Sequence, residues 1–152
     1  MIEHVTFNGI QFALIVRSSF REPGIHFFTP NDFSQQLAAM RHPAGHVIAP
    51  HVHNPVPREV HYTHEVLFLR RGRLRVDFYA GAGSYLESRE LGAGDVILLS
   101  AGGHGFEVLE EVEMIEVKQG PYAGVADKLR FPGVGADQVR VVTASESAQA
   151  KK

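Results

Sequence analysis

Short apolar stretches separated by glycine-rich turns make up most of the chain after residue 64. Residues 73–79 (RLRVDFY) alternate polar and apolar side chains with a period of two, which is typical of a strand with one buried face. A glycine-rich turn at residues 80–84 leads into residues 85–91, so these segments predict a hairpin. Further strands are predicted at residues 65–71, 95–100, 104–110 and 111–119. This succession of short strands predicts an antiparallel sandwich or barrel.

The N-terminal third adds one strand and one helix to this prediction. Residues 10–17 resemble the later strands. Residues 29–40 (TPNDFSQQLAAM) predict a short helix, because Pro30 stands early and apolar side chains recur at helical spacing. The candidate N-caps are Thr29, Asn31 and Asp32, and the recurring apolar residues are Phe33, Leu37 and Met40. Such a helix is expected to cover one flank of the barrel.

Length and composition indicate a single domain. The chain has 152 residues, of which 44% are hydrophobic, and this is enough to fill one core. It contains no internal repeat and no interdomain linker. The domain is expected to span residues 1–142, with a short strand near residues 138–142. The small and polar residues 143–152 are expected to form a flexible tail.

Charge and cysteine content narrow the classes of function. A formal net charge of -2 offers no general attraction to nucleic acid or to an acidic membrane, so a small molecule is the expected partner. The chain has no cysteine, and any metal must therefore be held by imidazole and carboxylate groups. Residues 1–20 lack a basic start followed by a long apolar run, and no segment approaches membrane-spanning length. A cytoplasmic location is the resulting expectation.

Histidines gather in front of the strand predicted at residues 65–71. Residues 50–72 contain four of the nine histidines. Two of them, His51 and His53, are two residues apart and would project to the same side of an extended chain. Such a pair can place two ring nitrogens on one ion, although a polar strand edge that faces solvent explains the same pattern.

Glu65 strengthens the case for a metal. Its alternate neighbours Leu67 and Leu69 are expected to point into the core, and a carboxylate in such a row is costly unless a positive charge neutralises it. A metal cation would do so. His104 also begins a row that is expected to point inward, with Phe106 and Val108 following it.

The predicted ligands are therefore His51, His53, Glu65 and His104. Three imidazoles and one carboxylate leave open positions around an octahedral divalent ion, which suits Fe, Mn, Ni, Co or Zn. His61 and His64 are rival ligands. His61 shares the side of Glu65 only if the chain is extended there, whereas His64 is expected to face away, so both are placed at the rim of the site.

These residues stand in the order of the two motifs of the cupin superfamily, which the chain resembles. Gly45 is followed after five residues by the pair at residues 51–53, and Glu65 is followed after six residues by Gly72. In the second motif, Gly94 is followed by Ser100, Gly102 and His104. Two features depart from the family pattern. Eleven residues separate His53 from Glu65 instead of about three or four. In the second motif, Ser100 replaces a proline and only Gly103 lies between Gly102 and His104.

The resemblance implies a small single-domain bacterial metal-binding cupin with the double-stranded β-helix (jelly-roll) barrel and its metal motifs at residues 45–118. It also implies a homodimer. Cupins include dioxygenases and isomerases, so the expected function is that of a metal-dependent enzyme acting on a sugar or another oxygenated small molecule. A non-catalytic cupin that binds or senses a ligand is the alternative, and a structural metal site is a third possibility. Glu116 and Lys118 are candidates for proton transfer if their strand turns them inward.

Overall fold

The structure, a computed structural model, describes residues 1–143, except for the side chains of residues 125 and 126. The predicted tail therefore lies, from residue 144 onward, outside the described residues. The strands are β1 (Ile2–Phe7), β2 (Ile10–Val16), β3 (Gly24–Phe27), β4 (Ala38–Arg41), β5 (Glu65–Ala80), β6 (Ser84–Gly92), β7 (Val96–Leu99) and β8 (Gly103–Lys118). Two short 3-10 turns follow, η1 (Gly124–Asp127) and η2 (Ala136–Gln138).

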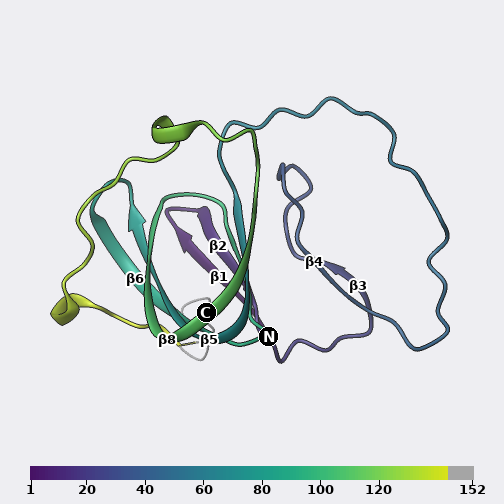
Figure 1. Ribbon diagram of the computed structural model, residues 1–152, viewed down its shortest axis with the longest axis horizontal. Helices are drawn as coiled ribbons and strands as arrows, with labels where there is room; N and C mark the ends of the chain where they lie inside the picture. The colour runs from purple at the N-terminus through teal and green to yellow at the C-terminus, as the bar shows by residue number, and fades with distance from the viewer. Residues whose placement is uncertain (144–152) are drawn as a thin grey trace.

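The main sheet is antiparallel and strongly curled. Its strands are ordered β1-β2-β7-β5-β6, and β8 pairs with β5 along nearly the whole of both strands. In Figure 1, β5 and β8 bend around the purple strands β1 and β2 to form half of a barrel. The all-β prediction is confirmed at this level, and the complete jelly-roll barrel stays a prediction.

Long β5 and β8 each replace two of the strands predicted from the sequence. The turn expected at Gly72 is a kink inside β5, where the register with β8 shifts. Gly72 has φ +84°, and a Cβ atom there would lie 2.0 Å from the carbonyl oxygen of Glu111, so only glycine fits. Leu69 before the kink and Leu74 after it are both buried, although their numbers differ in parity. The kink therefore reverses which residues point inward: odd-numbered residues face the core before it and even-numbered residues after it.

The core fills the inside of the curl. Glu65, Leu67 and Leu69 are buried together, so the inward row predicted at the start of β5 is confirmed. The largest fully buried side chains of this core are those of Ile15, Leu69, Leu74, Val76, Phe78, Leu91 and Ile97. Glu65 is thus held between β7 and β8 at one end of this apolar core.

The helix predicted at residues 29–40 is wrong. The Thr29 hydroxyl donates to Gln36 Oε1 at 2.7 Å and accepts from the backbone N–H of Leu37 at 3.2 Å, which closes a loop. Residues 38–41 then pair with β3 as strand β4. A side chain that bonds to the backbone competes with helix formation, and here the ladder with β3 adds a second competitor.

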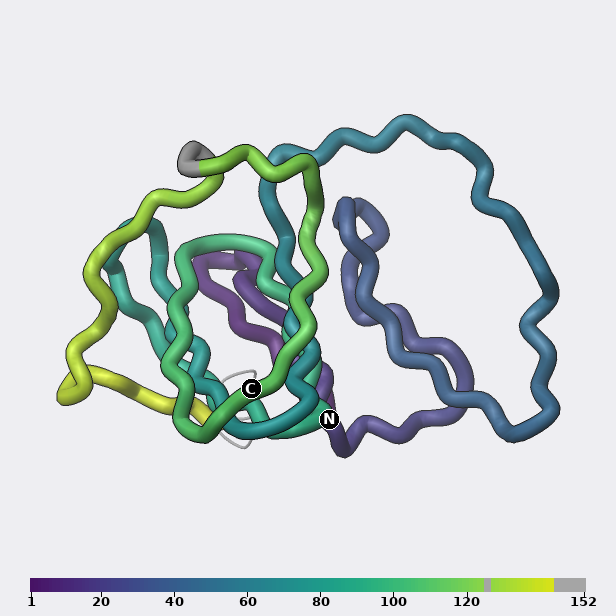
Figure 2. Tube along the Cα trace, viewed as in Figure 1, coloured from purple at the N-terminus to yellow at the C-terminus, as the bar shows by residue number. Residues whose placement is uncertain are grey.

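The hairpin of β3 and β4 stands beside the main sheet. It forms a separate two-stranded sheet, and the chain from residue 42 to residue 64 then runs as a long extended connection back to β5 (Figure 2). Several apolar side chains on these segments are exposed, namely those of Ile25, Phe27, Met40, Val47, Ile48 and Val52. This part of the chain buries little apolar surface of its own.

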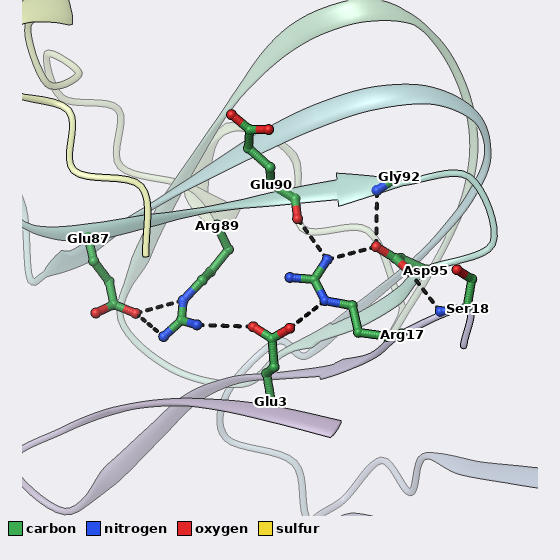
Figure 3. A network of polar contacts seen from close by, with 8 residues as sticks. All are labelled: Glu3, Arg17, Ser18, Glu87, Arg89, Glu90, Gly92 and Asp95. Carbon is green, nitrogen blue, oxygen red and sulfur yellow. Dashed lines mark hydrogen bonds and ion pairs between the residues drawn. The ribbon is translucent and has the colours of Figure 1, made fainter. Parts of the chain in front are cut away.

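At the end of the sheet away from Glu65, a buried network of charged side chains links neighbouring strands (Figure 3). Glu3 of β1 accepts from Arg17, which follows β2, and from Nη1 of Arg89 of β6 at 3.0 Å. Arg17 Nη1 also donates to Asp95 Oδ2 at 2.7 Å, and Arg89 pairs with Glu87. Glu3 is only 3% exposed, so its two arginines replace the water that it loses on folding.

Candidate functional site

The candidate site is built around the buried carboxylate of Glu65. This residue opens β5 and lies opposite Leu99 of β7 and Lys118 of β8 in the two ladders. Because directly opposed residues share a face of the sheet, Lys118 projects to the same side as Glu65. Glu116 is opposite Leu67 and faces that side too. Both proton-transfer candidates therefore share the face of Glu65, but only Lys118 approaches its carboxylate, and Glu116 is exposed.

Three nitrogen donors surround the Glu65 carboxylate. His104 Nε2 lies 3.0 Å from Oε2, and Lys128 Nζ donates to Oε1 at 3.3 Å. Lys118 Nζ is 3.9 Å from the same Oε1 and also lies 4.0 Å from Asp127. The sequence predicted that a metal ion would supply the positive charge beside Glu65. In the structure, lysine side chains supply it.

These neighbours control the ionisation of Glu65. The hydrogen bond from His104, helped by the charges of His104 and Lys128, lowers the pKa of Glu65 from 4.5 to about 2, although burial alone would raise it. In return, the negative charge of Glu65 raises the pKa of Lys128. At neutral pH the site holds an ionised carboxylate beside a protonated amine.

A cavity of about 240 Å³ lies next to this cluster. It is lined by Thr63, Glu65, Gly102, Gly103, His104, Asp127, Lys128, Leu129 and Phe131. A neighbouring cavity of about 310 Å³ shares His104 and Lys128 and adds Arg130. His104 and Lys128 thus border both spaces and are placed to contact a small polar molecule bound in either.

His104 reaches this position from β8. It is paired with Phe78 of β5, and Phe106 is paired with Val76, so the row that begins at His104 faces the same side as the core. Phe106 nevertheless stays 41% exposed, because this part of β8 lies at the open side of the half-barrel. The register places this row on the core side of the sheet, but Phe106 and Val108 are both exposed, so the row is not buried as predicted, and His104 lies where the core meets solvent.

His51 and His53 do not belong to the cluster around Glu65. Both are exposed on the connection between β4 and β5, with their ring centroids 5.2 Å apart in an edge-to-face contact. The Nδ1 atom of His51 is 3.0 Å from the carbonyl oxygen of Ala49. The structure therefore brings the predicted ligands together as two separate pairs, one of two histidines and one of Glu65 with His104.

The two rival histidines differ from each other. His61 is exposed and pairs with Glu59 at 3.2 Å, and it does not line the cavity beside Glu65. His64, which was also expected at the rim, is only 8% exposed, and burial lowers its pKa. Its backbone N–H donates to Gln119 Oε1 at 2.6 Å.

The four predicted ligands form two pairs and not one cluster. Within residues 1–143, no group of three or more histidine, aspartate and glutamate side chains is close enough to hold a metal. Both oxygens of Glu65 are engaged by His104 and Lys128. The metal site made of all four residues stays a prediction that the structure does not test.

Sequence reasoning missed Lys128 and Asp127. They belong to the segment after Gly120, which has no strand pattern and is predicted to be a loop. The segment returns to the sheet because Phe131 packs edge-to-face on Tyr79, with ring centroids 5.0 Å apart, and the backbone N–H of Val134 donates to the Tyr79 hydroxyl. No local signal in the sequence marks this return.

No protein-family model, no curated protein and no solved structure matches this chain. The resemblance to cupins therefore rests on its motifs alone. Among residues 1–143, no helix has the length and apolar character needed to cross a membrane.

Proposed function

We propose that the cavity beside Glu65 binds a small oxygenated metabolite that carries a negative charge, and that His104 exchanges a proton with it. The observation that carries the proposal is the buried, ionised Glu65 held by His104 and two lysines at the edge of a cavity. A buried carboxylate that specific partners keep charged at a cleft marks a candidate functional site. A sugar or hydroxy acid with a phosphate or carboxylate group has the required chemistry.

The roles of the residues follow from their positions. Glu65 holds Nε2 of His104 and so fixes the ring, as an orienting carboxylate does for a histidine base. Among the described residues, Nδ1 of His104 has no hydrogen-bond partner, and it is the atom offered to a ligand. Lys128 is about half exposed and supplies the charge for the anionic group. Proton transfer of this kind supports an isomerase, and binding without turnover supports the sensing alternative.

Replacing Lys128 with glutamine is expected to weaken binding at least tenfold. The substitution removes the ammonium that is nearest to both Glu65 and the two cavities. Ligand-observed NMR against a panel of sugar phosphates, sugar nucleotides and hydroxy acids would identify a ligand and measure its Kd. Arg71→Gln is the matched control, because Arg71 is an exposed cation paired with glutamates on β8. Equal weakening by both variants would point to non-specific charge attraction and contradict the proposal.

A divalent metal held by His51, His53, Glu65 and His104 remains the second candidate. The observation in its favour is that the His51 and His53 rings are already in contact, edge to face, with their centroids 5.2 Å apart. Such an ion would polarise a carbonyl group or activate oxygen, depending on its identity. The eleven-residue connection between His53 and Glu65 would have to bring the two pairs together.

Treatment with EDTA is expected to leave ligand binding unchanged, because lysines already neutralise Glu65. Elemental analysis of protein purified without a metal-affinity tag provides the direct measurement. Close to one metal ion per chain, lost in the double variant His51→Ala with His104→Ala, would overturn the metal-free proposal. It would establish the four-ligand site instead.

The homodimer expected from the resemblance also stays a proposal. The exposed apolar side chains of the β3–β4 hairpin and of the connection that follows support it, because a second copy of the chain could cover them. The cytoplasmic location also stays a prediction.

A further inference from the structure

The second cavity beside His104 has a wall that differs from the wall beside Glu65. Its volume is about 310 Å³, and it shares His104, Lys128, Leu129 and Phe131 with its neighbour. The other residues that line it are Tyr79, Gly105, Phe106, Arg130 and Gly133. None of these described residues is acidic, whereas Lys128 and Arg130 are cations, so the wall attracts an anion.

Arg130 is the cation of this wall that has no counter-ion. It is exposed, and no residue of the described chain forms a hydrogen bond or an ion pair with its side chain. Lys128, in contrast, already donates to Glu65 at 3.3 Å. The planar guanidinium group of an arginine presents two parallel N–H groups that match the two oxygens of a carboxylate. Arg130 is therefore placed to hold the anionic group of a ligand in this cavity.

Apolar and aromatic groups make up much of the remaining wall. Phe106 lies on the core side of β8, opposite Val76, and is nevertheless 41% exposed. Leu129 is 79% exposed. The Phe131 ring is fixed, because it packs on Tyr79 and lies so close to Gly103 that a Cβ atom there would be 2.9 Å from it. A flat ring in the cavity would remove the exposed apolar surface of Phe106 and Leu129 from water.

A polar atom that a ligand can reach lies beside these apolar groups. The His104 ring contacts Phe106, with centroids 5.3 Å apart, and its Nε2 atom is bound to Glu65. The Nδ1 atom of His104 has no hydrogen-bond partner among the described residues, and it does not belong to the buried atoms that lack one, so solvent reaches it. The cavity therefore offers a guanidinium group, an apolar face and an imidazole nitrogen to the same small molecule.

We propose that the ligand of this site is an aromatic carboxylic acid with one ring and a hydroxyl group on that ring. This inference rests on the function proposed above and names the class of the oxygenated anion. The carboxylate pairs with Arg130, the ring packs on Phe106, and the hydroxyl group forms a hydrogen bond with Nδ1 of His104. A sugar phosphate has the charge but lacks the flat apolar face that would cover Phe106.

Saturation-transfer-difference NMR on the full chain tests the proposal with salicylate, meta-hydroxybenzoate and para-hydroxybenzoate as probes. Cyclohexanecarboxylate has the same charge without a flat ring, and benzyl alcohol has the ring without the charge. At least one hydroxybenzoate is expected to bind at least threefold more tightly than cyclohexanecarboxylate and at least tenfold more tightly than benzyl alcohol. Contact with the Phe106 ring is also expected to shift the ring protons of the bound ligand upfield.

Two variants test the contacts separately. Arg130→Gln is expected to weaken binding of the hydroxybenzoate at least tenfold, whereas Arg70→Gln removes an exposed cation from the outer face of β5 and is expected to leave the Kd within twofold. Phe106→Ala is expected to weaken binding at least threefold. Val108→Ala is its matched control, because Val108 is 56% exposed in the same row of β8 and lines neither cavity.

The outcomes separate this inference from the function on which it rests. If no hydroxybenzoate binds while a sugar phosphate or an aliphatic hydroxy acid binds and depends on Lys128, the aromatic class is overturned and the proposed function stands. If neither kind of compound binds, both are overturned. Equal weakening by Phe106→Ala and Val108→Ala also contradicts the inference. Should Phe106→Ala not fold, Arg130→Gln decides the question, because Arg130 is exposed and bonds to no described residue.

Discussion

Replacing Glu3 with glutamine is expected to lower the free energy of unfolding by about 3 to 5 kcal/mol. The amide has nearly the same shape as the carboxylate but carries no charge, so Arg17 and Arg89 lose the anion that they share. The Arg89 side chain is only 3% exposed, and water does not replace that anion. The network also joins β1, β2, β6 and the turn before β7, so its loss weakens several strand contacts at once (Figure 3). Urea unfolding followed by circular dichroism measures the effect.

Glu111→Gln is the matched control for this experiment. Glu111 also pairs with an arginine, Arg71, but its side chain is 79% exposed. An exposed pair contributes about 0 to 1 kcal/mol, because solvent screens the charges and holding long side chains costs entropy. If the Glu3 variant lost no more than the Glu111 variant, the buried network would not be a source of stability.

Acid is expected to remove a part of the stability that comes from Glu65. Its pKa is about 2 in the folded chain and near 4.5 when unperturbed, so the unfolded chain binds the proton first as the pH falls. The contribution is fully present above about pH 4.5 and is lost as the pH falls to about 2. A shift of this size corresponds to on the order of 3 kcal/mol, at about 1.4 kcal/mol for each pKa unit.

The measurement compares wild type with Glu65→Gln in urea unfolding between pH 7 and pH 2. The difference between the two proteins isolates Glu65, since all other carboxylates titrate in both. The wild type is expected to lose stability more steeply than the variant between about pH 4.5 and pH 2. Glu111→Gln should keep the wild-type slope. Parallel curves for wild type and Glu65→Gln would show that His104 and Lys128 do not hold the carboxylate in its ionised form.

Local patterns predicted strands β2 and β5 to β8, missed β1, β3 and β4, and wrongly predicted a helix. The alternation in residues 73–79 requires one face in the core and one outside it, which a strand provides. The helical spacing of Phe33, Leu37 and Met40 was outweighed by the hydrogen bonds of Thr29 and by pairing with β3. Neither competitor is visible without knowing which segment lies beside residues 38–41.

Two of the four predicted metal ligands lie next to each other, and their strand positions explain why. Glu65 and His104 each stand in a row that points inward, and their strands are neighbours, so they meet. His51 and His53 precede a long connection that has no strand partner among the described residues, and nothing local determines where it lies. Their distance from Glu65 could not be predicted from motif spacing.

The sequence by itself determined an all-β domain, the inward position of Glu65 and the need for a positive charge beside it, because periodicity and burial cost depend on neighbouring residues. Only the tertiary structure decided what supplies that charge. Lys128 arrives from a loop anchored by Phe131 on Tyr79, and Lys118 arrives through the register of β8. It also decided that His64 is buried and borders the same cavity as Gln11, since contacts between distant segments depend on how the chain is packed.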